Sequence, residues 1–293
     1  IRDSSNGTQR EWYATSGADG KTVYNCEFPT TSGSGTGGSR DLLAECVTYG
    51  VSYKRDAVLH LTDHEPFSTG AAWVRNPIDL VSPLRMNFSF RMVNGTDNDQ
   101  KDRGPEGADG IALVFSGAPD FRTGEAGGAI GYRGLSNCVV VEFDAYLNAQ
   151  YADPSGSHVA VQSAHGKISP SHLAPYLRGV TTEIPSLRSD GTTYFVKVET
   201  DNASLKIYLS ETPVFSTPCL VINNFIFANE IDLSQSPQGY VALTSSTGFS
   251  VQDHEVLTWT VGSCSTLTSS VTSANGEDDN AIALQPQPAS DFV

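Results

Sequence analysis

Two carboxylates, Glu142 and Asp144, stand two positions apart near the end of a run of apolar residues. Because successive side chains of a β-strand alternate between its faces, both carboxylates project to the same side if this run is a strand. Neighbouring carboxylates on an apolar strand repel each other and lose hydration, so they need a cation, an arginine or a shared proton. The pair therefore marks a candidate site for metal or proton chemistry.

The residues that follow supply further ligand types. Asn148 and Asp153 lie in the next turn, and His158 opens the following predicted strand. Oxygen ligands suit calcium, whereas an imidazole suits a transition ion. A Glu-x-Asp pair alone is a common pattern, but the whole series on a strand and its turn favours a metal site over a solvated acidic loop.

The sequence around this series predicts strands and turns from about residue 43 to 262. Gly110–Phe115 and Cys138–Phe143 are continuous apolar runs, which are typical of central strands buried on both faces. No segment has a helical period longer than about two turns. Many strands and no helices in one long domain predict an all-β sandwich of two packed sheets.

Two further segments alternate between apolar and polar residues. Residues 84–92 predict a half-buried strand with Asn87 on its solvent-exposed face. Residues 194–199 and 205–209 predict a hairpin with Asn202 at its tip.

Charge and hydropathy exclude several classes of protein. The formal net charge is -15, which argues against nucleic acid and against an anionic membrane surface as partners. The sequence has no apolar stretch of the roughly 20 residues needed to cross a bilayer, so no membrane insertion is expected. The length of 293 residues suits one large all-β domain with extensions, or two small domains.

Five cysteines are present and none forms a C-x-x-C pair, so structural disulfides in an oxidising compartment are expected. Cys26 and Cys46 flank the Gly/Ser-rich segment 30–39, and a disulfide between them is the pairing suggested by proximity. The odd number leaves one thiol free or joined to a partner chain. N-x-S/T sequons predict a secreted or cell-surface glycoprotein, with candidate glycosylation sites at Asn6, Asn87, Asn94 and Asn202.

The series Glu-x-Asp-x-Tyr-x-Asn, followed by Asp and His, resembles the metal loop of legume-type (L-type) lectins, the concanavalin A-like family. The resemblance implies a jelly-roll β-sandwich that binds calcium and manganese or another transition ion. The implied transition-ion ligands are Glu142, Asp144, Asp153 and His158. The implied calcium ligands are Asp144, the Tyr146 carbonyl, Asn148 and Asp153, with Asp144 and Asp153 bridging the two ions.

Three more segments are similar to loops of this family. Residues 107–112 look like its first sugar loop, whose aspartate follows a cis Ala–Asp peptide, and 127–131 look like the second. Residues 239–248 and 254–259 resemble its closing strands and variable fourth loop. The implied sugar contacts are hydroxyls bound by Asp109, hydrogen bonds donated by Asn148 and the Gly128 N–H, and a ring face from Tyr146.

The resemblance covers roughly residues 42–262 and divides the chain into three parts. These are an N-terminal extension (1–21), an L-type lectin sandwich (22–263) and a polar, acidic C-terminal tail (264–293). The fourth loop is short, so the sequence does not show whether the site prefers mannose/glucose or galactose. The cysteines and the tail depart from plant lectins.

The expected function is non-catalytic binding of glycans or glycoproteins, with a homo-oligomer or larger assembly left open. One alternative is a concanavalin-like glycoside hydrolase, which needs a second catalytic carboxylate. Leu147 and Asn148 stand where that second glutamate would be. The other alternative is a structural subunit of an extracellular assembly with a lectin fold.

Overall fold

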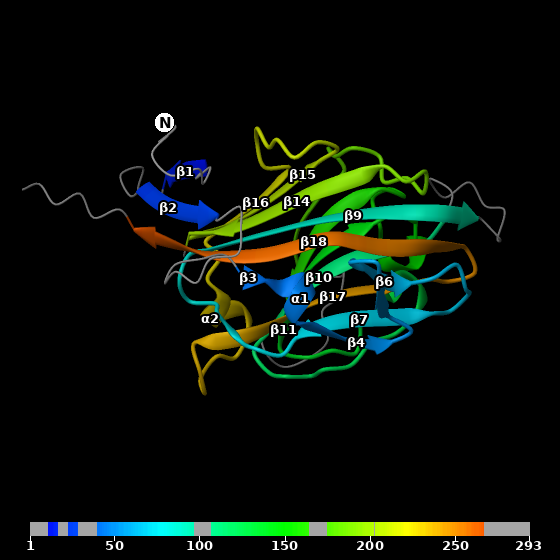
Figure 1. The fold of residues 1–293 in the computed structure, drawn as a ribbon, viewed down its shortest axis with the longest axis horizontal. Helices are drawn as coiled ribbons and strands as arrows, with labels where there is room; N and C mark the ends of the chain where they lie inside the picture. Colours follow the sequence, from blue (N-terminus) through cyan, green and yellow to red (C-terminus); the bar gives the residue numbers. More distant parts are fainter. Residues whose placement is uncertain are drawn as a thin grey trace, which may run out of the picture.

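The computed structural model is a sandwich of two antiparallel sheets that pack face to face (Figure 1). It describes residues 40–96, 107–163, 175–201 and 203–262 with side chains, and the backbone of strands at 11–16, 23–28 and 263–266. The predicted all-β sandwich is confirmed. Its helices are short: α1 (Leu42–Glu45), α2 (Phe227–Glu230) and the 3-10 turns η1 (Gly127–Ala129) and η2 (Ala149–Tyr151).

The larger sheet runs in the order β1 (Glu11–Ser16), β2 (Val23–Phe28), β18 (Val251–Thr266), β9 (Leu84–Thr96), β14 (Thr193–Thr200), β15 (Ser204–Ser210) and β16 (Leu220–Asn223). Beside this path, β3 (Arg40–Asp41) and β6 (Val58–Thr62) pair with β18, and β5 (Tyr53–Arg55) pairs with β6. The smaller sheet runs β13 (Leu177–Thr181), β12 (His158–Ser163), β11 (Cys138–Asp144), β10 (Gly110–Ser116), β17 (Gln238–Ser246), β7 (Thr69–Val74) and β4 (Cys46–Gly50), with β8 (Ile78–Asp79) on β17.

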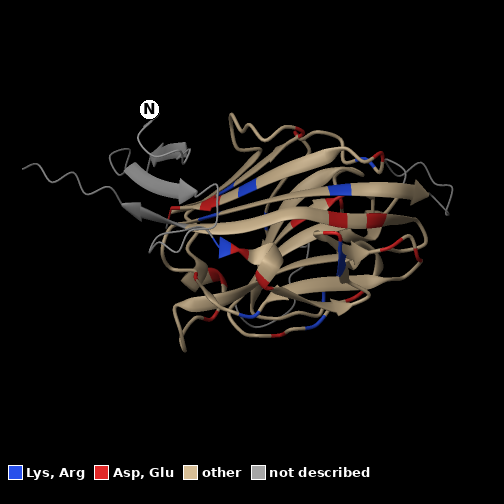
Figure 2. Ribbon diagram, viewed as in Figure 1, with Lys and Arg blue, Asp and Glu red and all other residues tan. Residues whose placement is uncertain are grey.

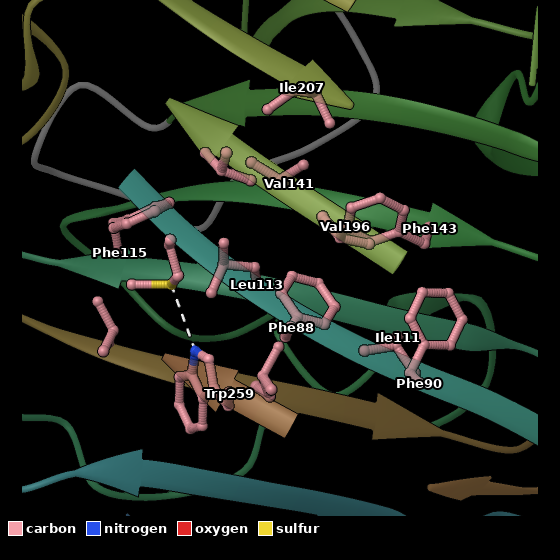
Figure 3. Close-up of a cluster of buried hydrophobic side chains, with 14 of the residues drawn as sticks. Phe88, Phe90, Ile111, Leu113, Phe115, Val141, Phe143, Val196, Ile207 and Trp259 are labelled. Atoms are coloured by element: carbon pink, nitrogen blue, oxygen red, sulfur yellow. Dashed lines mark hydrogen bonds between the residues drawn. The ribbon is translucent and has the colours of Figure 1, made fainter. Parts of the chain in front are cut away.

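Aromatic and aliphatic side chains together fill the space between the sheets (Figure 3). Phe88 and Phe90 of β9 contact Phe143 of β11, with ring centroids 5.7 and 5.8 Å apart. Trp259 of β18 is fully buried and donates its indole N–H to the Met86 sulfur at 3.3 Å. These contacts join the central strands of the two sheets into one core.

A second apolar cluster lies on the outer face of the smaller sheet. Ile130 and Tyr132, in the segment 117–137 between β10 and β11, pack on Val114 and Val140. Every residue of β10 and β11 is therefore buried, which confirms the prediction of strands covered on both faces. Glu142 and Asp144 follow Val140 on this outer face, because residues two apart on a strand share a side.

The larger sheet departs from the predicted pattern in one respect. Its β14–β15 hairpin is confirmed, although Asn202 lies outside the described residues. Strand β9 is more buried than its alternating sequence predicts, because Arg85 forms an ion pair with Glu199 at 2.5 Å and the Ser89 hydroxyl lies 2.7 Å from that of Thr258. These polar side chains pair with neighbours on β14 and β18 and are buried as a result.

The expected Cys26–Cys46 disulfide is wrong. Cys46 has a free thiol that is buried in the main core, where it donates to the Leu43 carbonyl at 3.5 Å. Cys138 and Cys219 are free as well, and the side chains of Cys26 and Cys264 lie outside the described residues.

Charges and chain ends complete the description. Figure 2 shows basic residues scattered singly over strands and loops in this view, not gathered into one continuous strip. Among the described residues, no helix is long and apolar enough to span a bilayer. Strand β1 falls within the predicted N-terminal extension and pairs with β2, which in turn pairs with β18. The two boundaries between the three predicted parts stay predictions.

Candidate functional site

Glu142, Asp144 and His158 come together on the outer face of the smaller sheet. Strands β11 and β12 are antiparallel, and their register sets Asp144 opposite His158. All three side chains are buried, and their ligand atoms lie within 4.8 Å of one another. The Glu142 Oε1 and His158 Nε2 atoms are 3.4 Å apart. The structure thus groups the two strand carboxylates and the imidazole as their spacing predicts.

Tyr132 orients Glu142 from the covering segment. Its hydroxyl donates to Glu142 Oε2 at 2.8 Å and accepts a hydrogen bond from the Gln162 amide at 2.9 Å. Burial, followed by the charge of Glu142, raises the pKa of Tyr132 well above its ordinary value, which keeps the phenol protonated as a donor. Sequence reasoning missed Tyr132 and Gln162, because no local spacing connects either residue to Glu142.

Asp144 lies in a position that favours a bound cation. Its Oδ1 accepts a hydrogen bond from the Tyr146 N–H at 2.7 Å, whereas its buried Oδ2 has no hydrogen-bond partner among the described residues. Burial raises the pKa of Asp144 well above its ordinary value, and the charges of Asp153 and Glu142 raise it further. A cation between these carboxylates would offset their repulsion and their lost hydration.

The turn after β11 places Asn148 and Asp153 beside this cluster. Asp153 is half-buried and accepts a hydrogen bond from the Asn148 N–H at 2.6 Å. It is not one of the three clustered residues, although its charge acts on Asp144. The amide oxygen of Asn148 is buried without a hydrogen-bond partner among the described residues. Oxygen donors of this kind fit calcium, and the nearby imidazole fits a transition ion.

Asp109 reaches the same edge of the sheet from the start of β10. The Ala108–Asp109 peptide is cis, as the resemblance implies. The Asp109 N–H donates to the Ser246 carbonyl at 3.0 Å, and its carbonyl accepts from the Ala145 N–H at 2.8 Å. Its Oδ2 is buried without a hydrogen-bond partner among the described residues. Burial, then the charge of Asp153, raises the pKa of Asp109 well above its ordinary value.

Gly128 packs directly on Asn148. A Cβ added to Gly128 would lie 2.5 Å from the Asn148 Cγ, so only a glycine fits here without a shift. The preceding Gly127 is held by the end of β17 and the residue after it: its N–H donates to the Thr247 carbonyl at 3.0 Å, and the Ser246 hydroxyl donates to its carbonyl at 2.6 Å. The structure therefore gathers Asp109, Gly128 and Asn148 at one edge of the smaller sheet.

Tyr146 is less exposed to solvent than its expected ring contact with a sugar requires. Only 7% of its surface is exposed. Its backbone N–H already binds Asp144, so the residue belongs to the turn of the cluster. Its stacking role stays a prediction.

The candidate glycosylation sites lie away from this cluster. Asn87 is half-buried on β9 and borders a cavity of about 360 Å³ on the outer face of the larger sheet. Asn94 is exposed, and its amide donates to Asp253 at 2.6 Å. Asn6 and Asn202 are outside the described residues. Glycosylation at all four stays a prediction.

Solved structures with the same fold include lectins. A lectin from Bauhinia forficata in complex with GalNAc is similar with a TM-score of 0.60, 18% identity, and coverage of 79% of this chain and 99% of that chain. Lectin I-B4 from Griffonia simplicifolia has a TM-score of 0.58 and 20% identity over 77% of this chain and 98% of its own. The exoplasmic/lumenal domain of VIP36, in a form bound to calcium and Man3GlcNAc, has a TM-score of 0.57 and 15% identity over 75% of this chain and 84% of its own.

Sequence comparison identifies the family. A probable L-type lectin-domain containing receptor kinase from Arabidopsis thaliana is 29% identical over 243 residues, which are 72% of this chain and 32% of the kinase. This chain therefore spans about a third of the length of that relative. The family model of the legume lectin domain matches residues 44–276, which include the whole smaller sheet, the larger sheet except β1, β2 and β3, and every residue of the cluster described above. The chain belongs to the legume lectin domain family.

Proposed function

We propose that this chain is a metal-dependent lectin, which binds glycans without chemical turnover at the edge formed by Asp109, Gly128 and Asn148. One observation carries the proposal: buried oxygens of Asp109, Asp144 and Asn148 have no hydrogen-bond partner among the described residues, and they belong to segments that meet at one edge. Buried polar atoms are normally satisfied, so oxygens left in this way indicate ligands that complete the site.

Two ions would complete the inner part of the site. Calcium would be held by Asp144, the Tyr146 carbonyl, Asn148 and Asp153, and a transition ion such as manganese by Glu142, Asp144, Asp153 and His158. The ions supply positive charge that compensates the carboxylates. The protein's own part is to fix the donors: Tyr132 holds Glu142, and the backbone of Asn148 holds Asp153. Supporting contacts of this kind normally orient metal ligands.

The sugar would bind the outer side of the same residues. Asp109 is an acceptor for two vicinal hydroxyls, while the Asn148 amide and the Gly128 N–H are donors. Hydrogen bonds to a carboxylate are worth roughly 1.5–3 kcal/mol each, so Asp109 would provide the largest polar contribution. Tyr146 would contribute a small apolar contact, limited by its burial.

Binding is better supported than hydrolysis. A glycoside hydrolase needs two carboxyl groups on either side of the scissile bond. Glu142 and Asp144 are fully buried beneath the covering segment, and the clustered His158 makes them suitable for metal. The positions where a second acid would stand hold Leu147 and Asn148. Glu142→Gln should therefore alter metal content, and no release of sugar from β-glucans is expected from the parent protein.

The proposed location is extracellular or on a cell surface, with glycans or glycoproteins as partners. The similarity to a receptor kinase and to an exoplasmic/lumenal domain supports this assignment. Association into a homo-oligomer stays a prediction, which light scattering would test.

Asp109→Asn tests the proposed function. Calorimetry would use the methyl glycosides of mannose and GalNAc, because the structural neighbours include a mannose-bound form of VIP36 and a lectin in complex with GalNAc. The affinity should fall about 10- to 100-fold with the lost charge, while the transition-ion content measured by elemental analysis stays that of the parent. The exposed Asp56→Asn removes the same charge elsewhere and should leave binding unchanged. Parent-like binding by Asp109→Asn would refute the assignment.

A further inference from the structure

Two exposed phenylalanines lie in contact near the proposed sugar site. Phe67, between β6 and β7, is 57% exposed, and Phe249, between β17 and β18, is 67% exposed. Their ring centroids are 4.8 Å apart, and the rings meet edge to face at 75°. No other phenylalanine among the fully described residues is exposed to this degree. Such a pair on a protein surface is an apolar platform, which we call the Phe67–Phe249 pair.

Backbone hydrogen bonds fix the two loops to each other. The Phe67 N–H donates to the Gly248 carbonyl at 3.1 Å, and the Thr247 N–H donates to the Ser68 carbonyl at 3.0 Å. The Thr247 hydroxyl donates to the Glu65 carbonyl at 2.5 Å and accepts from the Ser68 N–H at 3.0 Å. Because the loops are braced in this way, the pair loses little conformational freedom on binding a ligand.

The loop between β17 and β18, which carries Phe249, also borders the residues of the proposed sugar site. A Cβ added to Gly248 would lie 3.4 Å from the Asp109 Oδ2 and 3.6 Å from the Gly127 Cα. The Thr247 carbonyl also accepts the Gly127 N–H. Phe249 therefore follows Gly248, which borders the Asp109 carboxylate. The Phe67 N–H binds the carbonyl of the same Gly248. The aromatic pair stands at the rim of the site, one residue beyond Asp109's immediate neighbours.

We infer that the Phe67–Phe249 pair is a second subsite, which packs against the apolar C–H face of the sugar residue linked to the one held at Asp109. The inference rests on the proposed function. Pyranose rings have one face of C–H groups, and aromatic rings are the side chains that bury such faces at small entropic cost. The exposed Pro66 adjoins Phe67 and the polar Asp63, His64 and Glu65 precede it, so the apolar area is limited to the two rings and this one proline. That area suits one sugar ring and is far below the roughly 800 Å² per partner of a protein interface.

The test compares two ligands on three proteins. The probes are a methyl glycoside of mannose or GalNAc, whichever the parent binds, and the methyl glycoside of the corresponding disaccharide. The proteins are the parent, the double variant Phe67→Ala/Phe249→Ala, and Val214→Ala as control. Val214 is 74% exposed and borders the cavity on the larger sheet, so its truncation removes exposed apolar surface away from the site.

The parent should bind the disaccharide about five- to tenfold more tightly than the monosaccharide, as expected for one aromatic contact. The double variant should reduce this affinity ratio to about one, and Val214→Ala should preserve it. Calcium content and circular dichroism would show that the double variant is folded. The single variants should each lose part of the ratio.

Several outcomes would overturn the inference. A parent with equal affinity for both probes, or a double variant that keeps the parent's ratio, shows that the pair does not contact a second sugar. If a p-nitrophenyl monosaccharide gains affinity through the pair but the disaccharide does not, the occupant is an apolar aglycone, and the inference is also wrong. In all three cases the monosaccharide still binds through Asp109. A parent that binds no probe, with Asp109→Asn indistinguishable from it, refutes the proposed function itself.

Discussion

Gly128→Ala perturbs the proposed site at a single contact. Its added Cβ would lie 2.5 Å from the Asn148 Cγ, closer still to its Oδ1, and 2.9 Å from Tyr151 Cε2. Ordinary contacts begin at 3.4 Å, so the neighbours must move by about 1 Å. The Asn148 backbone is held by its hydrogen bond to Asp153 and by the turn of η2. The amide side chain must therefore swing away from its place.

The cost of this displacement has two parts. Overpacking a buried position costs about 1–3 kcal/mol, which corresponds to a melting temperature lowered by roughly 2–10 °C in a domain of this size. The displaced Asn148 amide would also lose its contacts with sugar and calcium. One or two lost hydrogen bonds weaken the affinity for the sugar about 10- to 100-fold.

Isothermal calorimetry and elemental analysis of calcium would measure both effects. Gly134→Ala is the matched control, because its added Cβ meets nothing within 4 Å and its positive φ of 92° adds only backbone strain. The control should lose some stability and keep the parent's affinity. If Gly128→Ala binds sugar and calcium as the parent does, the contact between Gly128 and Asn148 has no functional role.

Three other predictions concern bound metal, pH and glycosylation. Removal of bound metal by chelation at mildly acidic pH should abolish sugar binding and lower the melting temperature, because Asp144 would face other carboxylates uncompensated; Asp153→Ala should reproduce this state, and an unchanged melting temperature after verified metal loss would contradict the proposal. Burial lowers the pKa of His254 from 6.5 to about 3, so the unfolded chain binds this proton first as the pH falls. Stability should therefore decline from about pH 6.5 toward about 3, and His254→Gln should flatten that part of a urea-unfolding series. In material from a eukaryotic secretory pathway, peptide mass spectrometry should find glycans on Asn87 and Asn202; both unmodified would count against the proposed location.

Local pattern was sufficient for the parts of the molecule that depend on neighbours in sequence. The apolar runs that became β10 and β11 predict strands buried on both faces, since nothing polar interrupts them before Glu142. The period of two places Glu142 and Asp144 on one side whatever the rest of the fold does. Both outcomes rest on backbone geometry alone, and both are confirmed.

Contacts between distant segments could not be predicted in this way. Tyr132 reaches Glu142 because the segment 117–137 folds over the sheet, and no spacing in the sequence encodes that approach. The Phe67–Phe249 pair joins residues from two loops far apart in the chain. The Cys26–Cys46 pairing was wrong for the same reason, because proximity in sequence does not show that Cys46 lies inside the core.

The covering segment explains why stability and binding should be linked in this protein. It buries the outer face of the smaller sheet with Ile130, supplies Tyr132 to hold Glu142, and carries Gly128 against Asn148. Burial of that face is what removes water from Glu142 and Asp144 and so creates the need for cations. An ion that satisfies these carboxylates thereby also stabilises the segment that covers them. Sugar affinity, metal occupancy and melting temperature should therefore change together in variants that disturb Tyr132 or Gly128 of this segment, whereas variants of the Phe67–Phe249 pair should change the affinity ratio alone.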